Sequence, residues 1–97
     1  MPTPSLHKLF RKDVERDKNS GKYKKVDFDT LKKVMELLSA GESLDQRFKD
    51  HALDFEWSGY RECHIKPNWL LIYKVVHSDN EIIFARLGTH TQVFDGF

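Results

Sequence analysis

The segment Trp69-Leu70-Leu71-Ile72-Tyr73 decides the fold of this chain. A strand with one solvated face alternates apolar and polar residues, whereas this run has apolar or aromatic residues at every position. It therefore predicts a central β-strand that is covered on both faces. A bilayer-spanning helix needs about 20 apolar residues, so we expect no membrane association.

Three further strands are predicted around this central one, and turn sequences separate them. The predicted strands cover residues 52–57, 60–66, 69–76 and 81–87, with Ser58-Gly59, Pro67-Asn68 and Ser78-Asp79-Asn80 between them. Connections this short join antiparallel neighbours. The second half of the chain should thus form a mainly antiparallel sheet.

Two helices precede the sheet. Leu6, Leu9, Phe10 and Val14 recur at helical spacing and predict a first helix over residues 6–19. A second stripe, formed by Leu31, Val34, Met35 and Leu38, predicts another helix, which Asp27 or Asp29 can cap and Gly41 can end. The chain is expected to be one α+β domain over residues 1–97. Its two N-terminal helices should pack on one face of a four- to five-stranded sheet, leaving the other face partly open.

The composition is that of a small cytoplasmic protein. With 97 residues, one core already uses most of the apolar side chains. The single cysteine, Cys63, forms no intramolecular disulfide, which suits a reducing compartment. The first residues open no apolar run, so we expect no signal peptide.

Positive charge is concentrated in the first third. Residues 1–33 hold ten Lys and Arg against five acids, and residues 34–97 hold six against ten. This asymmetry is typical of a surface that faces a polyanion, with Lys22, Lys24 and Lys25 as its densest part. The alternative is a solvated helix face with mixed charges, since Lys12 and Arg16 adjoin Asp13 and Asp17.

Three histidines in the second half are the chemical candidates. Strand alternation puts Arg61, Cys63 and Ile65 on one face, toward the helices, and Tyr60, Glu62, His64 and Lys66 on the open face. His51 and His90 belong at strand ends, where a sheet usually presents chemistry. Imidazoles exchange protons near neutral pH, so three that converge suit acid–base catalysis. An isolated histidine is more often a surface residue. No Cys-x-x-Cys or His-x-x-x-His pair is present, so no metal is expected.

Three motifs together resemble a known family. They are Lys49-Asp50-His51, then Tyr60-Arg61-Glu62-Cys63-His64-Ile65-Lys66-Pro67-Asn68-Trp69, and Arg86-Leu87-Gly88-Thr89-His90 with Phe94 following. The order is similar to the YafQ branch of the RelE-type bacterial toxins. The resemblance implies a β-α-α-β-β-β fold and a RelB/DinJ-type antitoxin partner. It also implies metal-independent and cofactor-independent cleavage of mRNA in the ribosomal A site, by attack of the 2′-hydroxyl on the adjacent phosphate.

The same resemblance assigns roles to individual residues. It implies that His51, His64 and His90 are catalytic, with His51 or His64 as base and His90 as acid. Arg61, Lys66 or Arg86 would stabilise the phosphate charge, and Trp69 or Phe94 would stack on a base. The family commonly has aspartate where this chain has Asn68, which can orient a neighbour but cannot accept a proton.

Two other classes stay open. One is a RelE-fold toxin that binds a protein such as gyrase, as the ParE branch does, although that activity would not need three histidines. The other is an RNA- or antitoxin-binding module that has lost catalysis, with Asn68 as its sign.

Overall fold

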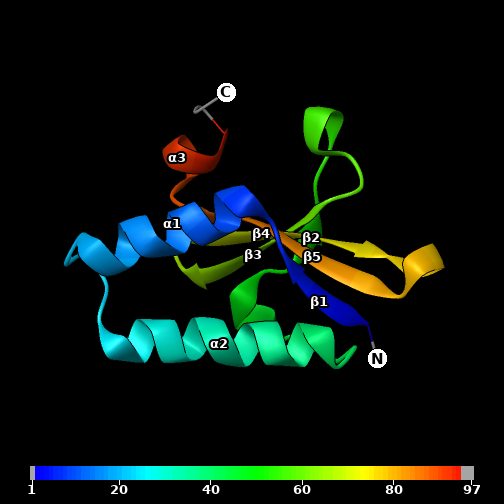
Figure 1. Cartoon of the computed structure of the whole chain (residues 1–97), viewed down its shortest axis with the longest axis horizontal. Helices are drawn as coiled ribbons and strands as arrows, with labels where there is room; N and C mark the ends of the chain where they lie inside the picture. Colours follow the sequence, from blue (N-terminus) through cyan, green and yellow to red (C-terminus); the bar gives the residue numbers. More distant parts are fainter. Residues whose placement is uncertain (1, 95–97) are drawn as a thin grey trace.

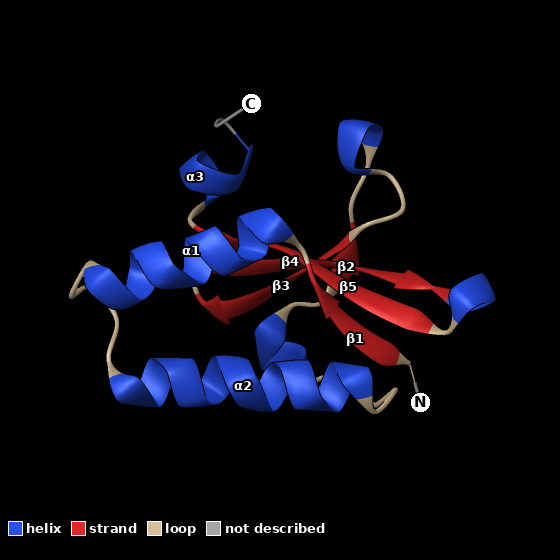
Figure 2. Cartoon of the chain, in the orientation of Figure 1, coloured by secondary structure: helices blue, strands red, loops and turns tan. Residues whose placement is uncertain are grey.

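The computed structural model describes residues 2–94 as a five-stranded mixed sheet with two long helices (Figures 1 and 2). Its helices are α1 (Lys8–Asn19), α2 (Lys25–Ser39) and the short α3 (His90–Phe94). Its strands are β1 (Thr3–Leu6), β2 (His51–Ala52), β3 (Arg61–Lys66), β4 (Trp69–Val76) and β5 (Glu81–Gly88). The strand order is β1-β5-β4-β3-β2, with β1 parallel to β5 and the other pairs antiparallel. The expected α+β class is confirmed. None of the helices described is long and apolar enough to cross a membrane.

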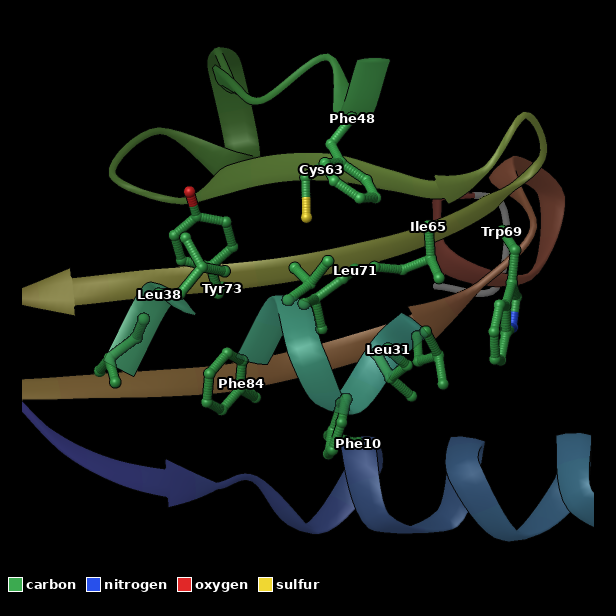
Figure 3. Packing of buried hydrophobic residues seen from close by; sticks show 13 residues of the cluster. Phe10, Leu31, Leu38, Phe48, Cys63, Ile65, Trp69, Leu71, Tyr73 and Phe84 are labelled. Carbon is green, nitrogen blue, oxygen red and sulfur yellow. The ribbon is translucent and has the colours of Figure 1, made fainter. Parts of the chain in front are cut away.

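Strand β4 is the centre of the sheet, as its apolar run predicted. All five residues from Trp69 to Tyr73 are buried, because each face of β4 meets a different cluster. Toward the long helices, Phe10, Val34 and Phe84 belong to the main core, which Figure 3 shows. On the opposite face a smaller cluster is centred on Ile72, Ala85 and Val93. Among residues 2–94, the cluster on this face is smaller than the main core.

Helix α2 has the two end signals that its sequence contains. The Asp27 carboxylate accepts a hydrogen bond from the Lys24 backbone N–H at 2.9 Å, which secures the first turn. At the other end Gly41 has φ +78°, and the N–H groups of Gly41 and Glu42 donate to the carbonyls of Leu38 and Leu37. This pair of bonds is the Schellman motif, for which glycine is the favoured residue. Asp27 rather than Asp29 caps the start, and Gly41 ends the helix as predicted.

The prediction of a helix over residues 6–19 was wrong at its start. His7 has extended backbone angles, and its Nδ1 accepts a hydrogen bond from the Leu9 N–H at 3.1 Å, so the helix begins at Lys8. Residues Thr3–Leu6 instead form β1, whose Thr3 pairs with Glu81 on β5. Leu6 and Leu9 are 39% and 43% exposed, so the core face of this helix begins at Phe10 and not at Leu6.

The predicted strand over residues 52–57 was also wrong. Strand β2 ends at Ala52, and Phe55–Trp57 is a 3₁₀ turn. Phe55 has φ +55° and is 91% exposed, and a residue in that conformation cannot continue a strand. Trp57 instead packs its ring against that of Phe94 of α3, with ring centroids 5.8 Å apart.

Candidate active site

The structure brings the three histidines together on the face of the sheet away from α1 and α2. The ring centroids of His51 and His64 are 6.2 Å apart, and those of His64 and His90 are 6.0 Å apart. They come from β2, β3 and the start of α3, so three separate elements contribute to the group. His64 is central because strand alternation directs it away from the core residues Cys63 and Ile65.

Glu62 lies between two of these histidines. Its Oε2 atom is 3.0 Å from His51 Nε2 and 3.4 Å from His64 Nε2, and the residue is only 4% exposed. Its other oxygen, Oε1, is buried and has no hydrogen-bond partner among the described residues. The sequence placed Glu62 on the same face as His64, yet we did not predict it as a site residue. The signal that could have identified it is its i, i+2 spacing from His64 on a strand.

The backbone fixes one nitrogen of each of these two rings. His51 Nδ1 lies 2.6 Å from the Lys49 carbonyl oxygen, and His64 Nδ1 lies 3.2 Å from the Pro67 carbonyl oxygen. A carbonyl only accepts, so both Nδ1 atoms must donate, and both Nε2 atoms then face the carboxyl group of Glu62. These Nε2–Oε2 contacts are favourable only if a further proton resides on an Nε2 atom or on the carboxyl.

His90 has a separate partner. The Oδ1 atom of Asn68 accepts a hydrogen bond from the His90 backbone N–H at 3.2 Å and lies 3.2 Å from His90 Nδ1. The backbone N–H can only donate, so the amide oxygen must face it, and the amide orientation is thereby fixed. Asn68 thus orients the imidazole and leaves Nε2 available. Phe94, one turn further along α3, lies beside His90 with its ring centroid 5.9 Å away.

Trp69 lies on the opposite face from the histidines. It is fully buried, stacks on Tyr23 at 4.1 Å between centroids, and meets Phe28 edge-on at 5.3 Å. Its indole Nε1 donates to Asp17 Oδ2 at 2.8 Å, and Figure 3 shows the side chain at the margin of the main core. In this position its surfaces are already occupied by protein. Of the two aromatic residues singled out for base stacking, only Phe94 is beside the histidines.

The three expected phosphate stabilisers are all paired with carboxylates. Arg86 binds Asp13 through Nε at 2.8 Å and a terminal nitrogen at 3.2 Å. The Nε of Arg61 lies 3.3 Å from Asp50 Oδ1. Burial disfavours the charged form of Arg61, but bonding to Tyr73 and Asp50 outweighs it and raises its pKa.

Lys66 departs from the predicted alternation. A β-bulge between His64 and Lys66 turns the Lys66 side chain toward α2, where Nζ lies 3.3 Å from Asp27 and 5.9 Å from the Tyr23 ring centroid. The prediction that Lys66 shares a face with His64 was therefore wrong. A bulge inserts one unpaired residue, so the residues after it face the opposite side of the sheet.

The first helix is less solvated than its mixed charges indicated. Asp13 and Asp17 are 4% and 3% exposed, and both bind Arg16. Asp13 also accepts from the backbone N–H of Leu87 at 3.0 Å. Together with the Asp17–Trp69 bond, these contacts anchor α1 to the start of β4, which follows Asn68, and to the end of β5, which precedes His90. The basic residues of the first third that stay exposed include Lys22, Lys24 and Lys25, around the start of α2.

Several solved structures of similar architecture are described as bacterial toxins. The structure superimposes on a crystal structure of a copper-bound mutant toxin from Helicobacter pylori with a TM-score of 0.85 at 39% identity, covering 97% of this chain and all of that one. It matches an Escherichia coli DinJ–YafQ toxin–antitoxin complex with a TM-score of 0.81 at 34% identity, covering 96% and 97%. In sequence it is 40% identical over 86 residues to the mRNA interferase toxin YafQ of E. coli strain B / BL21-DE3, covering 88% of this chain and 87% of the relative.

The family model described as the bacterial toxin of type II toxin–antitoxin systems, YafQ, matches residues 3–95. The chain belongs to the YafQ family of toxins. This confirms the family that the histidine motifs indicated.

Proposed function

We propose that this chain is a ribosome-dependent endoribonuclease that cleaves mRNA in the ribosomal A site, as the toxin of a type II toxin–antitoxin pair in the cytoplasm. The observation that carries the proposal is the group of three histidines on the open face of the sheet, two of which contact the buried carboxylate of Glu62. Its membership of the YafQ family, with a relative named as an mRNA interferase, supports the same activity.

The proposed reaction needs a base and an acid, and different histidines supply them. A 2′-hydroxyl loses its proton to Nε2 of whichever ring, His51 or His64, is not protonated toward Glu62, and its oxygen attacks the adjacent phosphorus, forming a cyclic phosphate. The bond to the 5′-oxygen breaks, and that oxygen takes a proton from His90. Glu62 orients the two basic rings through Oε2, and Asn68 orients the acidic one. No metal or redox step is needed for the atoms and charges to balance.

Positive charge at the phosphate must have a local source. Because Arg61, Lys66 and Arg86 are paired with carboxylates, we propose that the protonated imidazoles supply positive charge at the cleaved phosphate. We therefore propose that Arg61 and Arg86 act through the structure that they brace, and that Phe94 is the residue that contacts a base.

The test is primer extension on mRNA in a translating extract. Cleavage at codon boundaries by the wild-type chain, and much weaker cleavage of naked RNA, is the expected result. His64→Ala or His90→Ala should lower the rate about 10²- to 10⁴-fold while the protein stays folded. Equal cleavage of free and ribosome-bound RNA would contradict the ribosome dependence. Gyrase-dependent DNA damage without cleavage would indicate a ParE-like activity instead.

Metal independence needs its own test, since a related toxin is described as copper-bound. In the described part of this chain, no group of three or more His, Cys, Asp or Glu side chains is arranged to hold a metal ion. We expect EDTA to leave cleavage intact. Activity that EDTA abolishes and zinc or copper restores would reverse this proposal.

For the partner, we propose a DinJ-type antitoxin, because a related YafQ toxin is described in a DinJ–YafQ complex. Co-expression with such an antitoxin should yield a complex that no longer cuts mRNA. His64→Ala should enter that complex as the wild type does, since antitoxin binding needs no proton transfer.

A further inference from the structure

A pocket of about 370 Å³ opens beside His64. Its walls come from α2, the 3₁₀ turn Gln46–Phe48, the residue after that turn, and the β3–β4 turn. It is lined by Thr30, Arg47, Phe48, Lys49, His64, Ile65, Lys66 and Pro67. Sites for small ligands span about 300–1,000 Å³, so this one has room for one group and not for a folded partner.

The charge of this pocket is positive. Three of its lining residues are cations, Arg47, Lys49 and Lys66, and none is a carboxylate. Lys66 is neutralised in part by Asp27, with Nζ 3.3 Å from the carboxylate. Arg47 and Lys49 have no carboxylate within ion-pair distance among residues 2–94. Two uncompensated cations at the mouth of one pocket favour an anionic ligand.

Contacts within the chain help to fix the positions of Arg47 and Lys49. The Arg47 guanidinium lies 4.7 Å above the ring centroid of Phe48, which is itself buried. Lys49 has φ +50°, a left-handed conformation that a side chain with a Cβ rarely adopts. The Lys49 carbonyl in this conformation accepts from His51 Nδ1 at 2.6 Å. The backbone that positions the Lys49 side chain is therefore also the backbone that fixes a ring of the histidine group. Unusual backbone angles of this kind cluster at functional sites.

We propose that this pocket binds a backbone phosphate of the RNA strand, next to the bond that is cleaved, and that Arg47 and Lys49 are its ligands. The proposal rests on the function proposed above and adds to it a phosphate site beside the histidine group. His64 lines the pocket and also belongs to the histidine group, so a phosphate held here would fix the position of the neighbouring nucleotide. Arg47 offers the planar donor fork that suits phosphate oxygens, and Lys49 adds a point charge.

Binding is measured by fluorescence anisotropy with a short labelled RNA whose 2′-hydroxyls are methylated, so that it cannot be cleaved. Arg47→Gln with Lys49→Gln should weaken binding about five- to tenfold at low salt. Loss of one phosphate contact on a single strand lowers the slope of log affinity against log salt by about 0.7, so removing this one phosphate site should reduce the slope by about that amount. A charge-preserving pair, Arg47→Lys with Lys49→Arg, should keep the slope and lose only part of the affinity.

The matched control is Lys8→Gln with Lys12→Gln, which removes the same charge from exposed positions of α1 outside the pocket. It should bind the RNA within about twofold of the wild type, since distant exposed charges are screened. An equal loss in this control, or wild-type binding by the pocket variant, would overturn the proposed site.

Cleavage on ribosomes separates this site from the proposed activity. The pocket variant should raise KM and leave kcat unchanged, because a flanking contact is the same in the ground and transition states. A wild-type chain that cuts mRNA while the pocket variant cuts with unaltered KM would refute the pocket and leave the nuclease standing. A wild-type chain that cuts nothing, while the pocket variant still loses RNA affinity, would refute the nuclease and leave the pocket as an RNA-binding site.

Discussion

Asn68 offers the sharpest test of how the site works, because the two possible roles of its position predict rates of different size. In one role the residue only orients His90. In the other, the aspartate that the family commonly has here transfers a proton, and this chain is attenuated. The structure favours the first, since Asn68 Oδ1 contacts both the backbone N–H and Nδ1 of His90 at 3.2 Å.

The size of the orienting effect can be worked out from these contacts. Only one of them holds the ring directly, and a hydrogen bond contributes about 0.5–1.5 kcal/mol net. Asn68→Ala should therefore slow cleavage about two- to tenfold. Loss of a proton-transfer group would instead cost about 10²- to 10⁴-fold. Asn68→Asp keeps both acceptor contacts and should leave the maximal rate nearly unchanged. The added carboxylate favours the charged form of a neighbouring imidazole, so the pH–rate profile should move to higher pH.

The assay is single-turnover cleavage of ribosome-bound mRNA across pH for the wild type and both variants. Asn80→Asp is a suitable control, because it adds the same charge in the turn before β5, at a residue with φ +50°. A hundredfold gain in Asn68→Asp would refute the orienting role and mark the natural chain as attenuated.

Three further predictions concern the surface, the acid stability and the thiol. The first variant combines Lys22→Ala, Lys24→Ala and Lys25→Ala around the start of α2. It should lower the ribosome affinity and its salt dependence more than it lowers the free energy of unfolding. Unchanged ribosome binding would mean that this face is merely solvated. The pKa of Asp27 is lowered, first by the Lys24 backbone N–H and then by Lys66. Its stabilisation is complete above the ordinary carboxyl pKa of about 4 and is lost as pH falls through the lower folded value, so Asp27→Asn and wild type should differ in urea titrations at neutral pH and converge in acid. Burial raises the pKa of the Cys63 thiol, so iodoacetamide should label it only as fast as the chain unfolds, and rapid labelling without denaturant would contradict the buried placement.

Local patterns in the sequence predicted the elements that local interactions build. The bounds of β4 agree with its apolar run and its flanking turns, and α2 agrees with its stripe and its end signals. Alternation along β3 also put His64 on the open face. In each case the neighbours that decide the structure are a few residues away.

The features that were missed depend on partners far along the chain. The residue pattern missed strand β1, although the β-α-α-β-β-β order of the family resemblance implied a first strand. This strand forms through its pairing with β5, with Thr3 opposite Glu81, and no pattern in these four residues, which include Pro4, predicts that pairing. The buried carboxylates of α1 could not be told from a solvated face without knowing that Arg86 lies against them. The bulge after His64 is a property of the pairing between two strands and has no signature in either of them. The resemblance led us to expect that the three histidines converge. The order of the strands in the sheet is what places their rings about 6 Å apart.

The position of β5 between β1 and β4 has a consequence for how the molecule is made. Synthesis runs from β1 to β5, yet the strand that joins the first element to the rest is the last to be produced. Until residues 81–88 have been made, β1 has no strand to pair with and β4 has one unpaired edge, so the five-stranded sheet cannot form. His90 comes almost immediately after that strand, and the histidine group is complete only when it arrives. The histidine group therefore cannot form in a nascent chain before residue 90 has been joined and β5 has paired with β4.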